Sequence, residues 1–205
     1  MTIRTAAAVA ILLMLPLSLA CQQLVRPSDE ECDRAVGLVE RAELRSETAR
    51  EFRIIRSCGA KGGAALAQLL RRTSGTPSTE EFDRSVNLAL GFRDASILTT
   101  SLALASNRSA QIGARTAAFR VLLSMISGMR VTHASLITEG SLCRIFSLSG
   151  QAEGAQLPTD YLTQIREAAE SVRHEGGSAA ELRSAAECVS TAVRGATMRR
   201  PPTTH

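Results

Sequence analysis

The stretch that decides the fold is Ser109-Ala-Gln-Ile-Gly-Ala-Arg-Thr-Ala-Ala-Phe-Arg-Val-Leu-Leu-Ser-Met-Ile-Ser127, in a chain of 205 residues. At the period of an α-helix, its apolar residues form two neighbouring stripes. The first stripe consists of Ile112, Thr116, Phe119, Leu123 and Ile126, and the second of Ala118, Leu122 and Met125. Because so wide an apolar arc needs cover on more than one side, we expect a helix over 109–127 within a stacked layer. Arg115 lies between the stripes, so its guanidinium needs a buried partner or a path to solvent.

The rest of the chain predicts more helices and few strands. No Asn-Gly or Asp-Gly hairpin signal occurs, and no proline lies between Pro77 and Pro158. Capping boxes, a serine followed three residues later by a glutamate, mark helix starts at Ser28, Ser78 and Ser178. The expected helices span 29–43, 47–58, 62–72, 79–91, 94–106, 109–127, 141–149, 159–174 and 179–194. The β-branched segment 131–138 stays undecided between strand and helix.

One part of the chain resembles a HEAT-type repeat. Asp94-Ala-Ser-Ile-Leu98 and Leu102-Ala-Leu-Ala-Ser-Asn107 are similar to the leucine-spaced first helix of that repeat. Arg115-Thr-Ala-Ala-Phe-Arg-Val-Leu122 is similar to its second helix. The family usually has an aspartate in the intervening turn, which contacts the arginine, and this chain has Asn107 or Ser109 there.

Weak internal repetition accompanies this resemblance. Arg115-Thr-Ala-Ala-Phe-Arg-Val121 recurs as Arg183-Ser-Ala-Ala-Glu-Cys-Val189, and the leucines at 98 and 102 correspond to those at 66 and 70. The resemblance implies an all-α fold built as a short stack of antiparallel helical pairs, a HEAT-like α-solenoid. An irregular helical bundle is the alternative.

The first twenty residues have the features of a secretory signal peptide. Arg4 precedes an uncharged, mostly apolar run over 6–20, which is shorter than the ~20 residues of a membrane-spanning helix. Leu17-Ser-Leu-Ala-Cys21 resembles the lipobox of bacterial lipoproteins. The resemblance implies acylation of Cys21 and a lipid anchor in the cell envelope. Gln22 after the cysteine implies the periplasmic face of the outer membrane. Ordinary signal cleavage, giving a soluble periplasmic or secreted protein, and an uncleaved anchor are the alternatives.

These signals divide the chain into four parts. We expect a signal peptide over 1–20, a lipidated N-terminus with a short linker over 21–27, and a single all-helical domain over 28–197. A disordered tail over 198–205 follows.

The cysteines predict two disulfides. With Cys21 acylated, Cys32, Cys58, Cys143 and Cys188 remain, which is enough for two bridges in an oxidising compartment. Consecutive helices joined by a short turn run antiparallel, so Cys32, near the start of the first helix, meets Cys58, near the end of the second. Cys143–Cys188 is then the remaining pair. Four buried free thiols are the alternative. No C-x-x-C pair occurs, which disfavours a zinc ribbon.

The charge pattern gives a candidate binding surface. The formal net charge is +4, and Lys61 is the only lysine. Six arginines lie in the middle of the chain, where they could face an anionic lipid or an acidic partner. They are Arg84, Arg93, Arg108, Arg115, Arg120 and Arg130. A solvated helix surface is the simpler interpretation.

No motif predicts catalysis. The histidines are His133, His174 and His205, and none belongs to a recognisable catalytic or metal-binding pattern. Gly59-Ala-Lys-Gly-Gly63 lacks the spacing of a phosphate-binding loop, so we interpret it as the end of one helix and the start of the next. We therefore expect no catalytic residue, metal or cofactor. The aromatic content of 3%, together with export, argues against nucleic-acid binding.

These observations predict a lipid-anchored interaction or scaffold protein of the envelope, without catalytic activity and with a protein partner of unknown identity. Stacked helical pairs present an extended surface, which is how repeat proteins usually bind. A module that binds an anionic envelope component through the six arginines is the first alternative. An enzyme whose acid and base converge only in the folded chain is the second.

Overall fold

The computed structural model describes residues 27–41, 43, 50–127 and 157–198. Within these ranges the chain forms α-helices and no strand, which confirms the all-α prediction. The helices are α1 (Asp29–Glu40), α2 (Arg50–Ser57), α3 (Ala60–Thr73), α4 (Glu80–Ala89), α5 (Ala95–Ser106), α6 (Ile112–Ser127), α9 (Thr159–His174) and α10 (Ala180–Met198).

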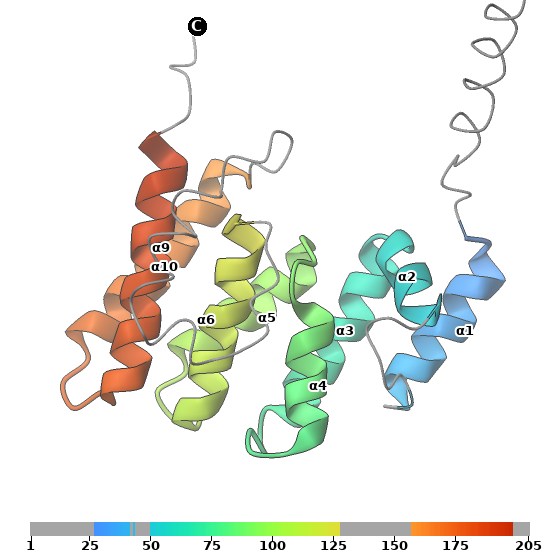
Figure 1. The fold of residues 1–205 in the computed structure, drawn as a ribbon, viewed down its shortest axis with the longest axis horizontal. Coiled ribbons are helices and arrows are strands. Elements are labelled where there is room, and N and C mark those ends of the chain that lie inside the picture. The colour runs from blue at the N-terminus through green and yellow to red at the C-terminus, as the bar shows by residue number, and fades with distance from the viewer. Residues whose placement is uncertain (1–26, 42, 44–49, 128–156, 199–205) are drawn as a thin grey trace, which may run out of the picture.

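The helices are arranged in successive pairs along the molecule (Figure 1). The two helices of each pair pack against each other: α1 with α2, α3 with α4, α5 with α6, and α9 with α10. The first helix of each pair also contacts the first helix of the next pair: α1 with α3, α3 with α5, and α5 with α9. Of the helices that come second in their pairs, α6 contacts both α4 and α10. Helix α6 therefore packs against α5 on one side and against two further helices on others.

Burial of α6 follows from this position. Every residue from Ala114 to Ser127 is buried, including Phe119, Leu122 and Leu123 at 0% exposure. This confirms the inference that the two apolar stripes are covered on more than one side. The sequence predicts Ile112 on the buried first stripe, and that prediction is wrong, because Ile112 is the first residue of the helix and remains 46% exposed.

The start of α6 also differs from the sequence prediction, which placed it at residue 109. The Asn107 side chain accepts a hydrogen bond from the Ser109 backbone N–H at 3.0 Å, and the Asn107 carbonyl accepts one from Ala110 at 3.0 Å. These local bonds form a turn that competes with helix, so the helix begins at Ile112. By contrast, α9 has the predicted bounds 159–174.

One of the three predicted capping boxes forms. The Ser28 hydroxyl accepts from the Glu31 N–H at 3.2 Å, and the Glu31 carboxylate accepts from the Ser28 N–H at 3.1 Å. At the capping box predicted for Ser78, Thr79 caps α4 instead, and its hydroxyl accepts a hydrogen bond from the Phe82 N–H at 3.2 Å. That prediction is wrong by one residue because either hydroxyl can cap.

The third predicted box, at Ser178, does not form. The Ser178 hydroxyl donates instead to the carbonyls of Val172 and Glu175, at 3.4 and 3.0 Å. These carbonyls belong to the end of α9, where the last carbonyls of a helix lack partners within the helix. Ser178 therefore closes α9, and α10 begins at Ala180.

The glycine-rich segment 59–63 ends α2 and starts α3, as the sequence predicts. Gly59 has φ 57°, a conformation that favours glycine, and α3 begins at the next residue. Gly62 and Gly63 lack a Cβ where other parts of the chain pack closely against α3. A Cβ at Gly62 would lie 2.2 Å from the Ile55 carbonyl oxygen, and one at Gly63 would lie 2.0 Å from Cγ of Asp94.

Several predictions concern residues outside the described ranges. They are the signal peptide over 1–20, the lipidation of Cys21, the helix over 141–149, the segment 131–138, Arg130, His133, Cys143, and the part of the 198–205 tail that follows Met198. The predicted tail is wrong at Met198, and so is the predicted helix end at 194, because α10 extends to Met198. None of the described helices is long and apolar enough to cross a membrane.

Candidate functional site

A disulfide closes the N-terminal helix pair. Cys32 on α1 is bonded to Cys58, which follows α2, with their Cα atoms 5.8 Å apart. The predicted Cys32–Cys58 bridge is therefore confirmed. Cys188, buried on α10, is also disulfide-bonded. Its predicted partner, Cys143, lies outside the described residues.

Arg115 is a core residue rather than part of a surface. It is 3% exposed, and its Nε donates to the Ala105 carbonyl at 3.0 Å. Its two terminal nitrogens bond both carboxylate oxygens of Glu175, at 2.9 and 2.6 Å. Hydrogen bonding and charge from Arg115 hold the pKa of Glu175 below its ordinary value. This bidentate ion pair, called the Arg115–Glu175 fork below, connects α6 to the turn between α9 and α10.

Arg120 is also buried, at 6% exposure. It donates to the side-chain oxygen of Asn87 on α4 at 3.2 Å. Burial lowers the pKa of Arg120, while the nearby Asp83 carboxylate acts in the opposite direction. The Arg120 side chain therefore helps to join α4 and α6. The proposed binding surface cannot include Arg115 or Arg120 as solvent-facing cations.

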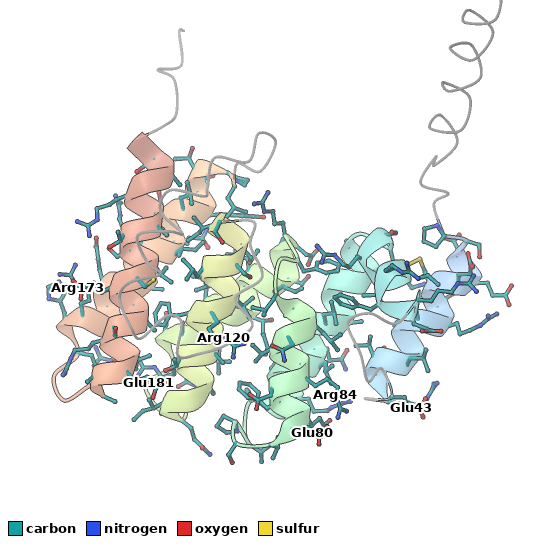
Figure 2. All side chains as sticks on the ribbon, viewed as in Figure 1. Glu43, Glu80, Arg84, Arg120, Arg173 and Glu181 are labelled. Atoms are coloured by element: carbon teal, nitrogen blue, oxygen red, sulfur yellow. A yellow bond between two sulfur atoms is a disulfide. The ribbon has the colours of Figure 1, made fainter. Side chains whose placement is uncertain are left out.

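The remaining described arginines of the set are separated along the fold. Arg84 lies beside Glu80 on α4 and pairs with it at 2.7 Å (Figure 2). Arg108 is exposed in the turn between α5 and α6. Arg93 precedes α5, and its Nε donates to the Met125 carbonyl at 3.0 Å. The structure therefore does not bring these arginines into one patch.

A small pocket does bring Arg93 together with another arginine. An open pocket of about 230 Å³ lies between the end of α2 with the turn that follows it and the turn between α4 and α5. Arg56 and Arg93 both line it. Sequence reasoning missed Arg56, which stacks over Phe52 at 5.8 Å. The spacing of four residues between the two could have indicated this contact.

A second pocket, of about 380 Å³, lies between α3 and α5. Its lining includes Arg71, Ala103 and Leu104, together with Ser74 and Asn107, the residues that end α3 and α5. Helix C-termini carry partial negative charge, which opposes the positive charge of Arg71. The electrostatics of this pocket are therefore mixed and select no ligand class.

The described residues hold no group of three or more histidine, cysteine, aspartate and glutamate side chains that could bind a metal ion. His174 is exposed at the last position of α9, where a basic side chain favours the helix dipole. A comparison of the chain with protein-family models, curated proteins and solved structures found no match.

Proposed function

We propose that the protein is a lipid-anchored interaction or scaffold protein of a bacterial cell envelope, with no catalytic activity of its own. Its helical domain would be a short HEAT-like α-solenoid that presents its outer faces to a protein partner. The observation that carries this proposal is the order of contacts, in which each first helix packs against the first helix of the next pair. Stacked pairs of this kind create an extended surface.

The internal repetition supports the solenoid part of the proposal. Arg115 and Arg183 are each the fourth residue of a second helix, α6 and α10. The alanine pairs that follow them, 117–118 and 185–186, are buried in both helices. Two segments with the same sequence pattern therefore begin at the same position of a second helix, although Arg115 is buried and Arg183 is exposed.

The Arg115–Glu175 fork gives further support. In the HEAT-type pattern an arginine of the second helix contacts an acidic residue of a turn. Here the acid comes from the turn between α9 and α10 rather than from the turn before Arg115. The arginine thus joins one helix pair to another, which suits a stack.

The anchor and the location rest on the resemblance of residues 17–21 to a lipobox. Acylation of Cys21 would place the helical domain at a membrane surface, behind a short linker. Several acyl chains on one residue anchor a protein stably, whereas a single chain binds only marginally.

The interaction claim is tested by photo-crosslinking in cells that make the full-length chain. A photoreactive amino acid replaces one exposed residue on each of four helices: Gln68 on α3, Asp83 on α4, Arg166 on α9 and Glu187 on α10. We expect a discrete crosslinked product from some of these positions and not from the others. Absence of any crosslinked product from all four positions, in protein that is folded and in the membrane fraction, would contradict the proposal.

A further inference from the structure

The pocket at the turns before α3 and α5 is lined by two arginines and one carboxylate. It is lined by Arg56, Arg93 and Asp94, by backbone at Gly59 and Gly91, and by Ala60 and Phe92. Gly59 and Gly91 have φ of 57° and 72°, which lets both turns reverse tightly at the same edge of the molecule. Because α3 and α5 pack side by side, both helices begin at this pocket.

The Arg56 guanidinium is held in place. It lies over the Phe52 and Phe92 rings, 5.8 and 6.0 Å from their centres. One terminal nitrogen donates to the Gly91 carbonyl at 3.2 Å, across to the other turn. Stacking and this bond fix the plane of the side chain, so little rotamer freedom remains to be lost when a ligand binds.

Arg93 has N–H donors that make no hydrogen bond within the described residues. Its Nε is used by the Met125 carbonyl at 3.0 Å, whereas its two terminal nitrogens bond no atom of the described residues. No carboxylate of the described residues forms an ion pair with it within 4.0 Å. Partial burial lowers the pKa of Arg93, as expected for a cation that loses water without gaining a counter-ion.

The one carboxylate in the lining is already used. Asp94 caps α5 by accepting from the Ser96 N–H at 2.8 Å. The start of α3, in contrast, has no acidic residue in its first turn and no side-chain cap. Lys61, in that first turn, is paired with Asp33 on α1. The free N–H groups at the start of α3 add positive potential to the pocket. The Asp94 carboxylate offsets part of it, because this side chain lies against Gly63 in the first turn of α3.

We propose that this pocket binds a single phosphate group, either free or carried by a phospholipid headgroup. Guanidinium groups match the oxygens of a phosphate through paired N–H donors. A helix N-terminus favours the same ligand, here as an addition to two arginines rather than as the site itself. The pocket volume of about 230 Å³ is below the ~300–1,000 Å³ of pockets for drug-sized ligands, which suits a small charged group. This inference goes beyond the scaffold proposal and does not depend on it.

The test uses the mature chain from residue 21 with Cys21→Ala, so that no acyl chain contributes to binding. Inorganic phosphate is titrated while amide NMR signals of Gly59 and Gly91 are followed. We expect saturable shifts at both residues, and weaker binding at higher ionic strength. Arg93→Gln is expected to weaken binding about tenfold or more, because it removes a charged donor.

A second variant avoids damage to the fold. Ala60→Asp places a carboxylate at the exposed first position of α3, where acidic residues stabilise a helix. It should raise or preserve the melting temperature and still abolish phosphate binding by occupying the positive site. Gln68→Glu is the matched control, since it adds the same charge at an exposed position two turns further along α3. This control should bind phosphate as the parent does.

Vesicles distinguish the two sources of phosphate. Displacement of inorganic phosphate by phosphatidylglycerol vesicles, but not by phosphatidylcholine vesicles, assigns the site to an anionic lipid headgroup. Phosphate binding that vesicles do not displace assigns it to a free phosphate. The proposal is overturned if neither probe shifts Gly59 and Gly91, or if Ala60→Asp binds phosphate as well as Gln68→Glu does.

Discussion

Removal of the Cys32–Cys58 bridge should destabilise the protein substantially, starting at its N-terminal end. The bridge joins residues separated by 26 positions, and it connects the start of α1 to the end of α2. Neither helix is long, and α2 has only two buried residues, Phe52 and Ile55. The pair therefore depends on the cross-link to limit the freedom of the unfolded chain.

The expected magnitude follows from the length of the closed loop. The chain-entropy relation gives about 3.5 kcal/mol at 25 °C for a loop of 26 residues. For a chain of this size, such a loss corresponds to a fall in melting temperature of about 7–14 °C. Packing of α1 against α3 does not offset this loss, because that packing is present with and without the bridge.

The assay is urea unfolding of the parent and of Cys32→Ala/Cys58→Ala, with Cys188 untouched. Hydrogen exchange is measured alongside it, and amides of α1 and α2 should lose protection before those of α6. The double serine variant serves as control for the lost sulfur atoms, and it should behave like the double alanine variant. A loss of stability below about 1 kcal/mol, with unchanged exchange in α1, would mean that the bridge does not stabilise this helix pair.

Three further outcomes are expected. Leu122→Asp should prevent cooperative thermal unfolding by circular dichroism, because it buries a carboxylate in a fully enclosed helix; a melting temperature within a degree or two of the parent would mean that this face is exposed. Because Arg115 lowers the pKa of Glu175, their ion pair should stabilise the protein at pH values above the ordinary pKa of about 4.5. This stabilisation should be lost as the pH falls through the lowered pKa, and Glu175→Gln should flatten that part of the pH–stability profile. Gly63→Ala should lower the melting temperature despite the better helix propensity of alanine, whereas Gly75→Ala, where a Cβ meets nothing within 4 Å, should not.

The sequence predicts those features that depend on local pattern. The stripes at 109–127 indicate a helix covered on several sides, and the structure buries every residue from Ala114 to Ser127. The Cys32–Cys58 bridge follows from helix order alone, since the ends of an antiparallel pair must meet. Both inferences need only periodicity and chain connectivity.

Features that depend on distant partners could not be predicted in the same way. Arg115 needs a buried carboxylate, but nothing in its sequence neighbourhood shows that Glu175 supplies it from a turn 60 residues further along the chain. The six arginines share an interval of the sequence but not a helix face. Arg115 and Arg120 occupy different sides of one enclosed helix, so tertiary packing removes both from the surface.

The pocket with Arg56 and Arg93 shows the same limit. Arg56, in the last turn of α2, and Arg93, in the turn before α5, are separated in sequence by a complete helix pair, α3 and α4. They line one pocket because the two turns lie at the same edge of the molecule. A sequence pattern identifies the glycines that allow each turn. It does not identify which turns become neighbours.

The proposal that lipid holds this helical domain at a membrane is tested by intact-mass analysis of the N-terminus. The protein is isolated from the membrane fraction of cells grown with and without globomycin, an inhibitor of the lipoprotein signal peptidase. We predict a chain that begins at Cys21 and carries the added mass of acyl chains, and a precursor that retains residues 1–20 when the inhibitor is present. An unmodified Cys21, or a mass that the inhibitor leaves unchanged, would contradict the account.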